Sequence, residues 1–157
     1  MSFYRSFIRP ILFRFDPEWI HSRTLDLGEW VGMSPLSMNL LASLLVFDDP
    51  RLKIEIAGLQ FPNPVGLAAG FDKSGRAIKA LSKMGFGSVE IGSVSEGASN
   101  GNPKPRLFRL PEDEAVVVNY GVPNDGAKII ADRILATPIS VPLGVNLVET
   151  NTGKAIT

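Results

Sequence analysis

The chain has 157 residues, of which 45% are hydrophobic and 20% are charged, and this balance excludes a wholly disordered or collagen-like protein. Sixteen Lys and Arg residues offset sixteen Asp and Glu residues, so there is no overall positive field, and we expect no nucleic-acid partner. The sequence has no cysteine and a single histidine, His21, which excludes disulfides and cysteine nucleophiles and argues against a bound metal.

The first fifteen residues predict a basic amphipathic helix. Before Asp16 the only charged side chains are Arg5, Arg9 and Arg14. A Phe-rich helix with arginines suits a membrane interface, whereas a helix packed on a core with solvated arginines explains the same pattern, and both readings stay open. The apolar positions recur at three- and four-residue spacing: Phe3, Phe7, Ile8, Ile11, Leu12 and Phe15.

Two further helices are expected before residue 48. Asp16-Pro17-Glu18 combines an N-cap acid, a proline in the first helical position and an acid in the first turn. The uncharged run from Trp30 to Phe47 is interrupted by glycine, proline and polar residues, so we expect a helix capped by Ser34, with Pro35 in its first turn, and no bilayer span.

The sequence pattern changes from helical spacing to period-two alternation at Asp48-Asp49-Pro50, which we take as a domain boundary. We therefore expect residues 1–49 to form a helical domain and residues 50–157 to form a second domain. Directly after the boundary, residues 52–57 and 59–61 alternate between apolar and polar side chains around a glycine, which predicts a small hairpin.

Strands and helices alternate through the rest of the chain. This order predicts right-handed β-α-β crossovers, a parallel sheet and the α/β class. A complete (β/α)8 TIM barrel needs roughly 200 residues or more, so the helical segment is followed by only the first strands and helices of a barrel, or by a small open sheet. The expected elements are a buried strand at 64–70, a helix at 74–84, a strand at 88–94, extended segments at 106–110 and 115–118, a helix capped by Asn124 or Asp125, and a strand at 141–147.

Three of these strands end in residues suited to binding. Ala68-Ala69-Gly70 would let a planar or phosphorylated ligand lie against bare backbone, and Lys73 supplies a positive charge close by. Ser93 and Asn146 end the next two strands, and the amide of Asn146 can both donate and accept. Because functional residues of barrels gather at the carboxyl ends of strands, we expect a site there, although a Gly-Ala run also serves tight packing.

Four segments match one enzyme family in the same order along the chain. They are residues 16–21 (DPEWIH), 63–73 (NPVGLAAGFDK), 84–93 (MGFGSVEIGS) and 101–111 (GNPKPRLFRLP). These segments resemble class 2 dihydroorotate dehydrogenases, which are membrane-associated, quinone-dependent flavoproteins that contain FMN. The resemblance covers nearly the whole chain. It implies that residues 1–49 are a helical domain associated with the membrane and with quinone, and that residues 50–157 are the N-terminal portion of an FMN-binding α/β barrel.

The resemblance implies roles for individual residues. Lys73 matches a lysine that contacts both the flavin and the carboxylated pyrimidine, and His21 and Arg109 match polar residues of the quinone tunnel. In the alternative structural reading Asp72 is a loop cap, His21 an ordinary helix residue and Arg109 an ion-pair partner. The residues that match FMN-binding positions are Ala69, Gly70, Phe71, Asp72, Lys73, Ser93 and Asn146.

The resemblance also implies an activity and partners. In this family a base removes a proton from dihydroorotate while hydride passes to the flavin, which then reduces a quinone, and the product is the pyrimidine precursor orotate. We expect the serine base and the C-terminal half of the barrel beyond Thr157, so no catalytic base is expected in this chain, which alone would not be competent. The expected location is the membrane surface, peripheral and on the cytoplasmic side, as in bacteria.

Two departures from the family pattern put the substrate in question. Val118 stands where the family has a substrate-binding asparagine, and Asn119, one position further on, is the remaining candidate for that contact. Glu149 reverses the charge of a lysine-bearing segment. Three hypotheses therefore remain: the parent activity, a diverged flavoprotein with another substrate, or a truncated, non-catalytic module that binds a membrane or partner.

Overall fold

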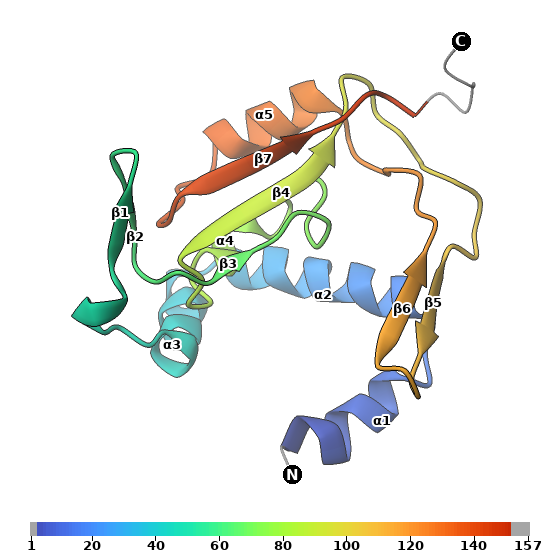
Figure 1. Cartoon of the computed structure of the whole chain (residues 1–157), viewed down its shortest axis with the longest axis horizontal. Coiled ribbons are helices and arrows are strands. Elements are labelled where there is room, and N and C mark those ends of the chain that lie inside the picture. Colours follow the sequence, from blue (N-terminus) through green and yellow to red (C-terminus); the bar gives the residue numbers. More distant parts are fainter. Residues whose placement is uncertain (1–2, 152–157) are drawn as a thin grey trace.

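A computed structural model describes residues 3–151, in which a helical segment precedes two hairpins and a parallel sheet (Figure 1). The amphipathic helix expected at the start is confirmed from Tyr4 to Leu12, while Met1 and Ser2 lie outside the described residues. The elements of the helical segment are a π-helical turn (Tyr4–Ile8), α1 (Arg9–Leu12), α2 (Pro17–Gly32) and α3 (Pro35–Leu45).

The starts of α2 and α3 test two capping predictions. Asp16 caps α2 as expected, since its carboxylate accepts a hydrogen bond from the backbone N–H of Trp19 at 2.8 Å. Ser34 occupies the N-cap position of α3, but within residues 3–151 its side chain makes no capping bond. The hydroxyl of Ser37 bonds to the Ser34 carbonyl at 2.9 Å instead, so the expected cap at Ser34 is wrong in its chemistry although right in position.

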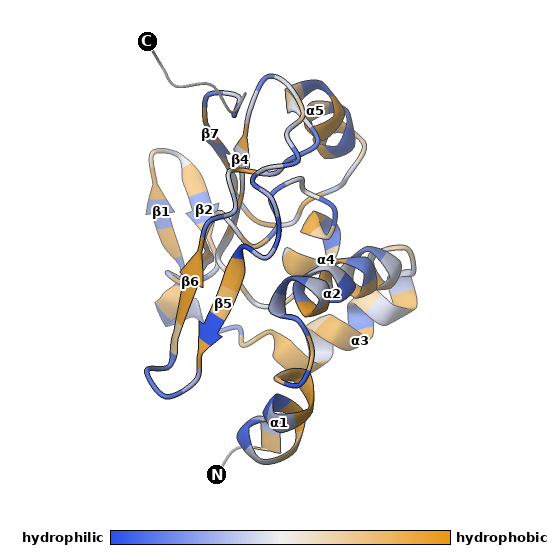
Figure 2. Ribbon diagram, turned by 90° about the vertical axis from the view of Figure 1, so that its right-hand side faces the viewer, coloured by the Kyte–Doolittle hydropathy of each residue, from blue (hydrophilic) through white to orange (hydrophobic). Residues whose placement is uncertain are grey.

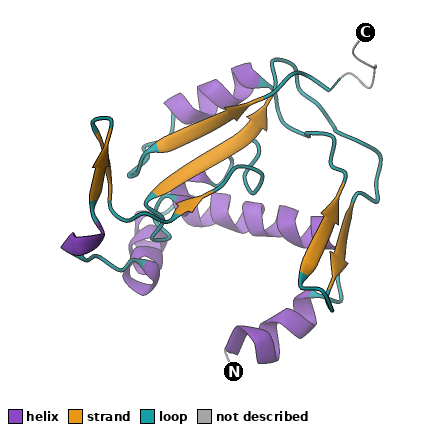
Figure 3. Cartoon of the chain, viewed as in Figure 1, coloured by secondary structure: helices purple, strands orange, loops and turns teal. Residues whose placement is uncertain are grey.

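Two antiparallel hairpins flank the sheet (Figure 3). A short 3-10 turn (Pro50–Leu52) leads into β1 (Ile54–Ile56) and β2 (Leu59–Phe61), which confirms the first hairpin. The extended segments expected near residues 106–118 pair as β5 (Leu107–Leu110) and β6 (Ala115–Val118).

The central sheet is parallel, as the alternation of strands and helices predicted, and its strand order is β3-β4-β7. Its strands are β3 (Gly66–Leu67), β4 (Ser88–Val94) and β7 (Leu143–Leu147), connected through α4 (Ile78–Leu81) and α5 (Ala127–Leu135). The strand expected at 64–70 is only two residues long, and Gly66 is exposed, so the expectation of a buried strand there is wrong. Among the described residues, β3 pairs on one side only, which explains its exposure.

The helix expected at residues 74–84 spans only Ile78–Leu81, and a side-chain interaction accompanies its late start. The carboxylate of Asp72 accepts hydrogen bonds from the backbone N–H groups of Arg76 (2.9 Å) and Ala77 (2.7 Å). These bonds hold residues 72–77 in turns, because a side chain that captures backbone donors competes with the helix.

A different prediction fails at the start of α5. Gly126 is its N-cap residue, with a φ of +85°, and no side chain of residues 3–151 caps the helix. Asn124, one of the two expected caps, instead accepts hydrogen bonds from Gly126 N–H (2.9 Å) and Ser95 N–H (3.2 Å) and donates to the Ser95 hydroxyl (2.8 Å). Asn124 therefore joins two loops rather than capping a helix, and Asp125 pairs with Arg133 at 2.9 Å.

The core lies between β4 and the helices that cover it. Its buried side chains come from α2, α4, β4 and α5 and from the residue before α4, which ties the helical segment to the sheet: Leu25, Ala77, Ile78, Leu81, Val89, Ile91, Val94 and Ile130. By contrast, β6 is hydrophobic along its length and exposed at Val116, Val117 and Val118 (Figure 2).

Helix α2 closely approaches the residues that precede α4. A Cβ atom added to Gly28 would lie 2.8 Å from the Cβ of Ala77, so only glycine allows this approach without a shift. Arg76 reinforces it through ion pairs with Asp26 and Glu29, both at 2.7 Å. None of the helices described is long and apolar enough to cross a membrane.

Candidate functional site

The loop 68–73 and the ends of β4 and β7 meet along one edge of the sheet. The backbone N–H of Gly70 donates to the Gly92 carbonyl at 2.8 Å, and Gly92 N–H donates to the Asp72 carbonyl at 3.3 Å. The hydroxyl of Ser93 donates to the amide oxygen of Asn146. We call loop 68–73 with Ser93 and Asn146 the strand-end site.

Backbone geometry makes this site accessible. Gly70 has a φ of +103°, and a Cβ atom added there would meet no described atom within 4 Å, so the backbone of the loop borders open space. At Gly92 a Cβ atom would lie 2.5 Å from the carbonyl oxygen of Asn146, so glycine is needed for the two strands to approach.

Asp72 contributes its backbone rather than its side chain to the site. Its side chain is directed into the protein, where both carboxylate oxygens accept the backbone hydrogen bonds that precede α4, and the residue is 1% exposed. The carboxylate is therefore a loop cap, the structural reading that the sequence allowed.

Lys73 ends the loop of the strand-end site, and its ammonium lies over an aromatic ring. Its ammonium donates to the Gly70 carbonyl at 2.7 Å and sits 4.3 Å from the centre of the Tyr120 ring. Burial lowers the pKa of Lys73, and the nearby carboxylate of Glu18 opposes that shift. Phe71 contacts His21 edge to face, with ring centres 5.1 Å apart, which brings α2 to the same loop.

A buried ion pair beneath Tyr120 was missed by the sequence reasoning. Arg106 donates from Nη2 to Glu18 at 2.7 Å and from Nε to both Glu18 oxygens at 3.2 and 3.3 Å. The side chains are only 8% and 11% exposed, respectively. Hydrogen bonds from Arg106 hold the pKa of Glu18 below its usual value. The two residues are 88 positions apart, so no spacing pattern could have paired them.

A pocket of about 480 Å³ adjoins this group. We call it the lysine pocket; its lining includes Lys73, His21, Glu18, Arg106 and Tyr120. Burial, followed by the charge of Lys73, lowers the pKa of His21, which favours the neutral imidazole. The structure therefore brings His21 and Lys73 together.

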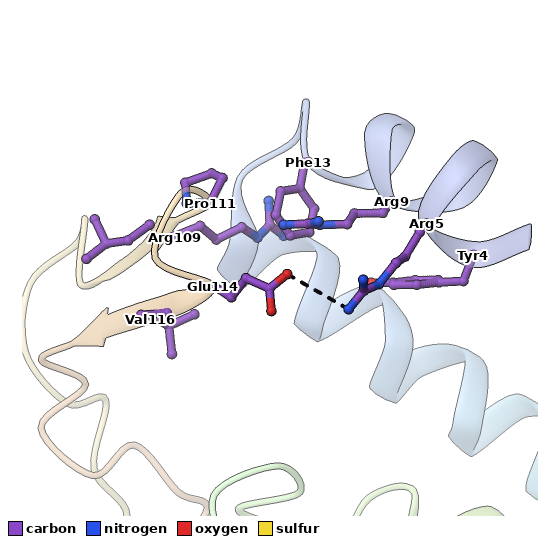
Figure 4. A pocket seen from close by; sticks show the side chains of 10 residues that line it. Tyr4, Arg5, Arg9, Phe13, Arg109, Pro111, Glu114 and Val116 are labelled. Atoms are coloured by element: carbon purple, nitrogen blue, oxygen red, sulfur yellow. Dashed lines mark ion pairs between the residues drawn. The ribbon is translucent and has the colours of Figure 1, made fainter. Parts of the chain in front are cut away.

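Arg109 lies in a different pocket, of about 270 Å³, between the N-terminal helical turns and the β5–β6 hairpin (Figure 4). We call it the arginine pocket; its lining includes Arg109, Arg5, Arg9, Phe13 and Glu114. Arg109 donates to the Phe15 carbonyl at 3.0 Å, and its guanidinium lies 4.5 Å from the centre of the Phe13 ring. His21 and Arg109, expected in one quinone tunnel, thus line separate pockets.

Asn119, the candidate for a substrate contact, points to a different partner. Its amide oxygen accepts a hydrogen bond from Asn102 at 2.8 Å, and its backbone N–H donates to the Arg106 carbonyl at 2.8 Å. The next residue, Tyr120, is the one that reaches Lys73. Tyr120 was not a sequence candidate, although it directly follows Asn119.

Comparison with known proteins shows the family. A family model of dihydroorotate dehydrogenase matches residues 51–153, and the chain therefore belongs to the dihydroorotate dehydrogenase family. Proteins named dihydroorotate dehydrogenase (quinone) from Gloeobacter violaceus and Chloroflexus aurantiacus are each 46% identical, over 147 and 149 residues. These alignments cover 94% and 92% of this chain but 41% of each relative, so the chain spans about two fifths of their length.

Solved structures show the same fold. DHODH from Eimeria tenella in complex with ferulenol has a TM-score of 0.66 and 35% identity, covering 86% of this chain and 36% of that protein. The ligand-free form has a TM-score of 0.68 and 34% identity, with 86% and 38% covered. The helical segment and the β3-β4-β7 sheet therefore correspond to an N-terminal helical part followed by the first strands and helices of an incomplete (β/α)8 barrel.

Proposed function

We propose that this chain supplies the N-terminal part of an FMN-dependent, quinone-linked oxidoreductase that oxidises dihydroorotate to orotate. The observation that carries the proposal is the strand-end site, where the bare backbone of loop 68–73 meets Ser93, Asn146 and a partly buried lysine. It is supported by the chain's membership of the dihydroorotate dehydrogenase family.

The residues present fit FMN. The open space at Gly70 suits a flat ring lying against the backbone, and the Ser93–Asn146 pair offers donors and an acceptor to a heterocycle edge. FMN bound there would supply the hydride-accepting chemistry. The residues proposed to hold it are Ala69, Gly70, Phe71, Asp72 (through its backbone), Lys73, Ser93 and Asn146.

Lys73 is proposed to contact both the flavin and the substrate. Its ammonium lies on the loop that borders the open space, where it can pair with the carboxylate of a pyrimidine and stabilise negative charge that develops during the reaction. Asn119 is proposed as a weaker substrate contact, reached only if its bond to Asn102 opens.

The helical segment, residues 1–49, is proposed as the quinone- and membrane-facing domain, with residues 50–157 as the FMN-binding part. Arg109 and the aromatic rings of the arginine pocket offer a cationic and apolar wall to a quinone head group. His21 lines the lysine pocket and contacts Phe71 of loop 68–73, so we propose the lysine pocket as a second route for quinone to the flavin. Exposed apolar side chains on the helices support peripheral attachment to the cytoplasmic side of a membrane: Phe3, Phe7, Ile11, Trp19, Trp30, Leu36, Leu40 and Leu44.

A chimera tests the proposal in a complete barrel. In it, this chain replaces the matching segment of the Gloeobacter violaceus relative, which is 46% identical. The purified chimera should be yellow, and dihydroorotate added without oxygen should bleach the flavin absorbance. Replacing Lys73 by Gln should leave the colour and slow the bleaching roughly a hundredfold or more, because one stabilising charge is lost. A chimera that folds but stays colourless would contradict the FMN site.

A second candidate, a flavoprotein with a changed substrate, is favoured by one observation. Val118 replaces the family's asparagine, and the neighbouring Asn119 is bonded to Asn102 rather than free to take over. A yellow chimera whose flavin is not bleached by dihydroorotate would support this candidate. In that case Val118→Asn should tighten orotate binding about tenfold or more, since a pocket that hydrogen-bonds its ligand discriminates strongly.

A further inference from the structure

The ring of Tyr120 contacts two cations. The Lys73 ammonium is 4.3 Å from its ring centre, and the Arg106 guanidinium carbon is 5.3 Å from the same centre. Both distances fall within the range in which a cation is attracted by an aromatic ring. The ring therefore contacts the Lys73 cation of loop 68–73 and also Arg106, whose ion-pair partner Glu18 lies on α2.

Hydrogen bonds fix the Arg106 guanidinium, and one of them goes to the backbone carbonyl of Tyr120. Its Nε and Nη2 groups bind the carboxylate of Glu18, while Nη1 donates to the carbonyls of Asn100 (2.6 Å), Asn102 (2.8 Å) and Tyr120 (3.3 Å). An arginine whose three side-chain nitrogens are all hydrogen-bonded in a buried setting has little freedom to move. The position of Tyr120 thus follows from a charge pair anchored on α2.

We infer that Tyr120 is a positioning residue for Lys73, and that the Glu18–Arg106 pair fixes Tyr120, so that helix α2 determines where the lysine cation is presented. The inference rests on the proposed function for the ligand that Lys73 meets. The placement itself can be measured without any ligand.

The charges around Lys73 make this arrangement matter. The groups that face it are Glu18 and His21 from α2, Asp72 from its own loop and Arg106 ahead of β5. Burial disfavours its ammonium form, and Arg106 acts in the same direction, whereas Glu18 and the ring of Tyr120 favour the charged form. Tyr120 and Glu18 therefore favour the charged form of the partly buried Lys73 and also hold its ammonium in place.

NMR of the chain with ¹³C-methylated lysines tests the placement. Methylation keeps the positive charge, and Lys73→Arg identifies the Lys73 signal. Methyl groups above an aromatic face are displaced upfield, so the Lys73 signal should be displaced upfield in the wild type, retain that displacement in Tyr120→Phe and lose it in Tyr120→Leu. Its titration midpoint should be lower in Tyr120→Leu than in Tyr120→Phe. An undisplaced signal in the wild type overturns the inference.

A second pair of variants tests the link to α2. Glu18→Gln removes the charge that holds Arg106 and should reduce the upfield displacement and lower the Lys73 midpoint. Lys104→Gln is the matched control, because Lys104 also pairs with Glu18, at 3.3 Å, but its side chain is 67% exposed. If the two variants give the same Lys73 signal, the role of the Glu18–Arg106 pair is overturned, and an amide spectrum confirms that each variant is folded.

The outcome is separable from that of the proposed function. FMN is absent from the NMR samples, so failure to bind flavin in the chimera leaves the Lys73 measurement intact. Conversely, a yellow and active chimera whose Lys73 signal ignores Tyr120 would keep the proposed function and reject the positioning role.

Discussion

The lysine pocket and the arginine pocket both contain arginines and aromatic rings, but they hold them differently. In the lysine pocket, Arg106 and Glu18 are 8% and 11% exposed and bonded to each other and to backbone carbonyls. In the arginine pocket, the ion pair of Arg5 and Glu114 spans 3.9 Å, and both side chains are about two thirds exposed, at 66% and 67%. One pocket is built on fixed, desolvated charges, and the other on charges that remain in water.

The difference suits the two pockets to different ligands. Desolvated, fully bonded charges act strongly and cannot easily be rearranged, which is what the placement of a small anionic substrate requires. Solvated arginines beside exposed rings can adapt to an amphiphilic ligand or to lipid head groups. The comparison therefore predicts large effects from changes at Arg106 and small ones at Arg109.

The largest effect is expected from breaking the buried pair. Arg106→Leu leaves Glu18 as a buried charge without its main partner and should reduce the free energy of unfolding by about 3–5 kcal/mol, the range for removing one member of a buried pair. Urea denaturation at neutral pH measures this loss. A decrease below about 1 kcal/mol would mean that the pair is solvated and that the contrast between the pockets is wrong.

A smaller effect is expected from pH. The pKa of Glu18 is lowered on folding, so below 4.5 the unfolded chain binds more protons and stability is lost as the pH falls through the folded pKa. The pKa of His21 is also lowered, so protonation favours the unfolded chain and stability begins to fall below about 6.5.

Unfolding midpoints in urea, measured from pH 7 to pH 3.5, separate these two contributions. Glu18→Gln should flatten the lower part of the profile, and His21→Gln the part nearer 6.5. Asp48→Asn is a suitable control, since Asp48 makes an exposed pair with Lys53 in which the two side chains are 67% and 51% exposed. A profile that His21→Gln leaves unchanged would show that the imidazole is not desolvated.

Features that depend on local sequence patterns could be predicted from the sequence, whereas contacts between distant segments could not. The parallel sheet, the first hairpin and the positions of Ser93 and Asn146 near strand ends follow from local alternation and from the rule that parallel strands end at one edge, and the fold confirms them. The Glu18–Arg106 pair depends on two segments meeting in space, and Glu18 in a first helical turn looks like any dipole-compensating acid.

Local side-chain chemistry accounts for the errors in helix bounds. The apolar spacing of residues 74–84 is helical, but the carboxylate of Asp72 accepts hydrogen bonds from the backbone N–H groups of Arg76 and Ala77, and the helix begins only at Ile78. Before α5, Asn124 is of a residue type common at N-caps, yet its side-chain amide joins two loops. In both cases a polar side chain had two local partners to choose from, and pattern alone cannot decide between them.

Lipid binding by the helical segment tests whether the arginines of the arginine pocket remain in water. If the arginines there remain solvated, each should add about 1 kcal/mol, or roughly fivefold, to partitioning onto anionic vesicles. Arg9→Gln should therefore weaken flotation with phosphatidylserine vesicles about fivefold at low salt and have little effect with neutral vesicles. Arg51→Gln, after the helical segment, is the control, and equal binding of all three proteins at low salt would contradict the proposed membrane face.

The smallest effect on stability is expected at Arg109. Its hydrogen bonds go to the carbonyls of Phe15 and Leu12, at 3.0 and 3.4 Å, and these acceptors can turn to water when the arginine is replaced. Arg109→Gln should therefore reduce the free energy of unfolding by about 0.5–1 kcal/mol, well below the loss at Arg106.

In the chimera, the same change should raise the KM for quinone a few-fold, since the guanidinium also lies over Phe13 and a partly exposed contact of this kind contributes about 0.5–1 kcal/mol. Flavin reduction by dihydroorotate should be unchanged, whereas Lys73→Gln should slow that reduction. If Arg109→Gln slowed both half-reactions equally, the two pockets would act as one site, and the separation seen between their linings would not extend to function.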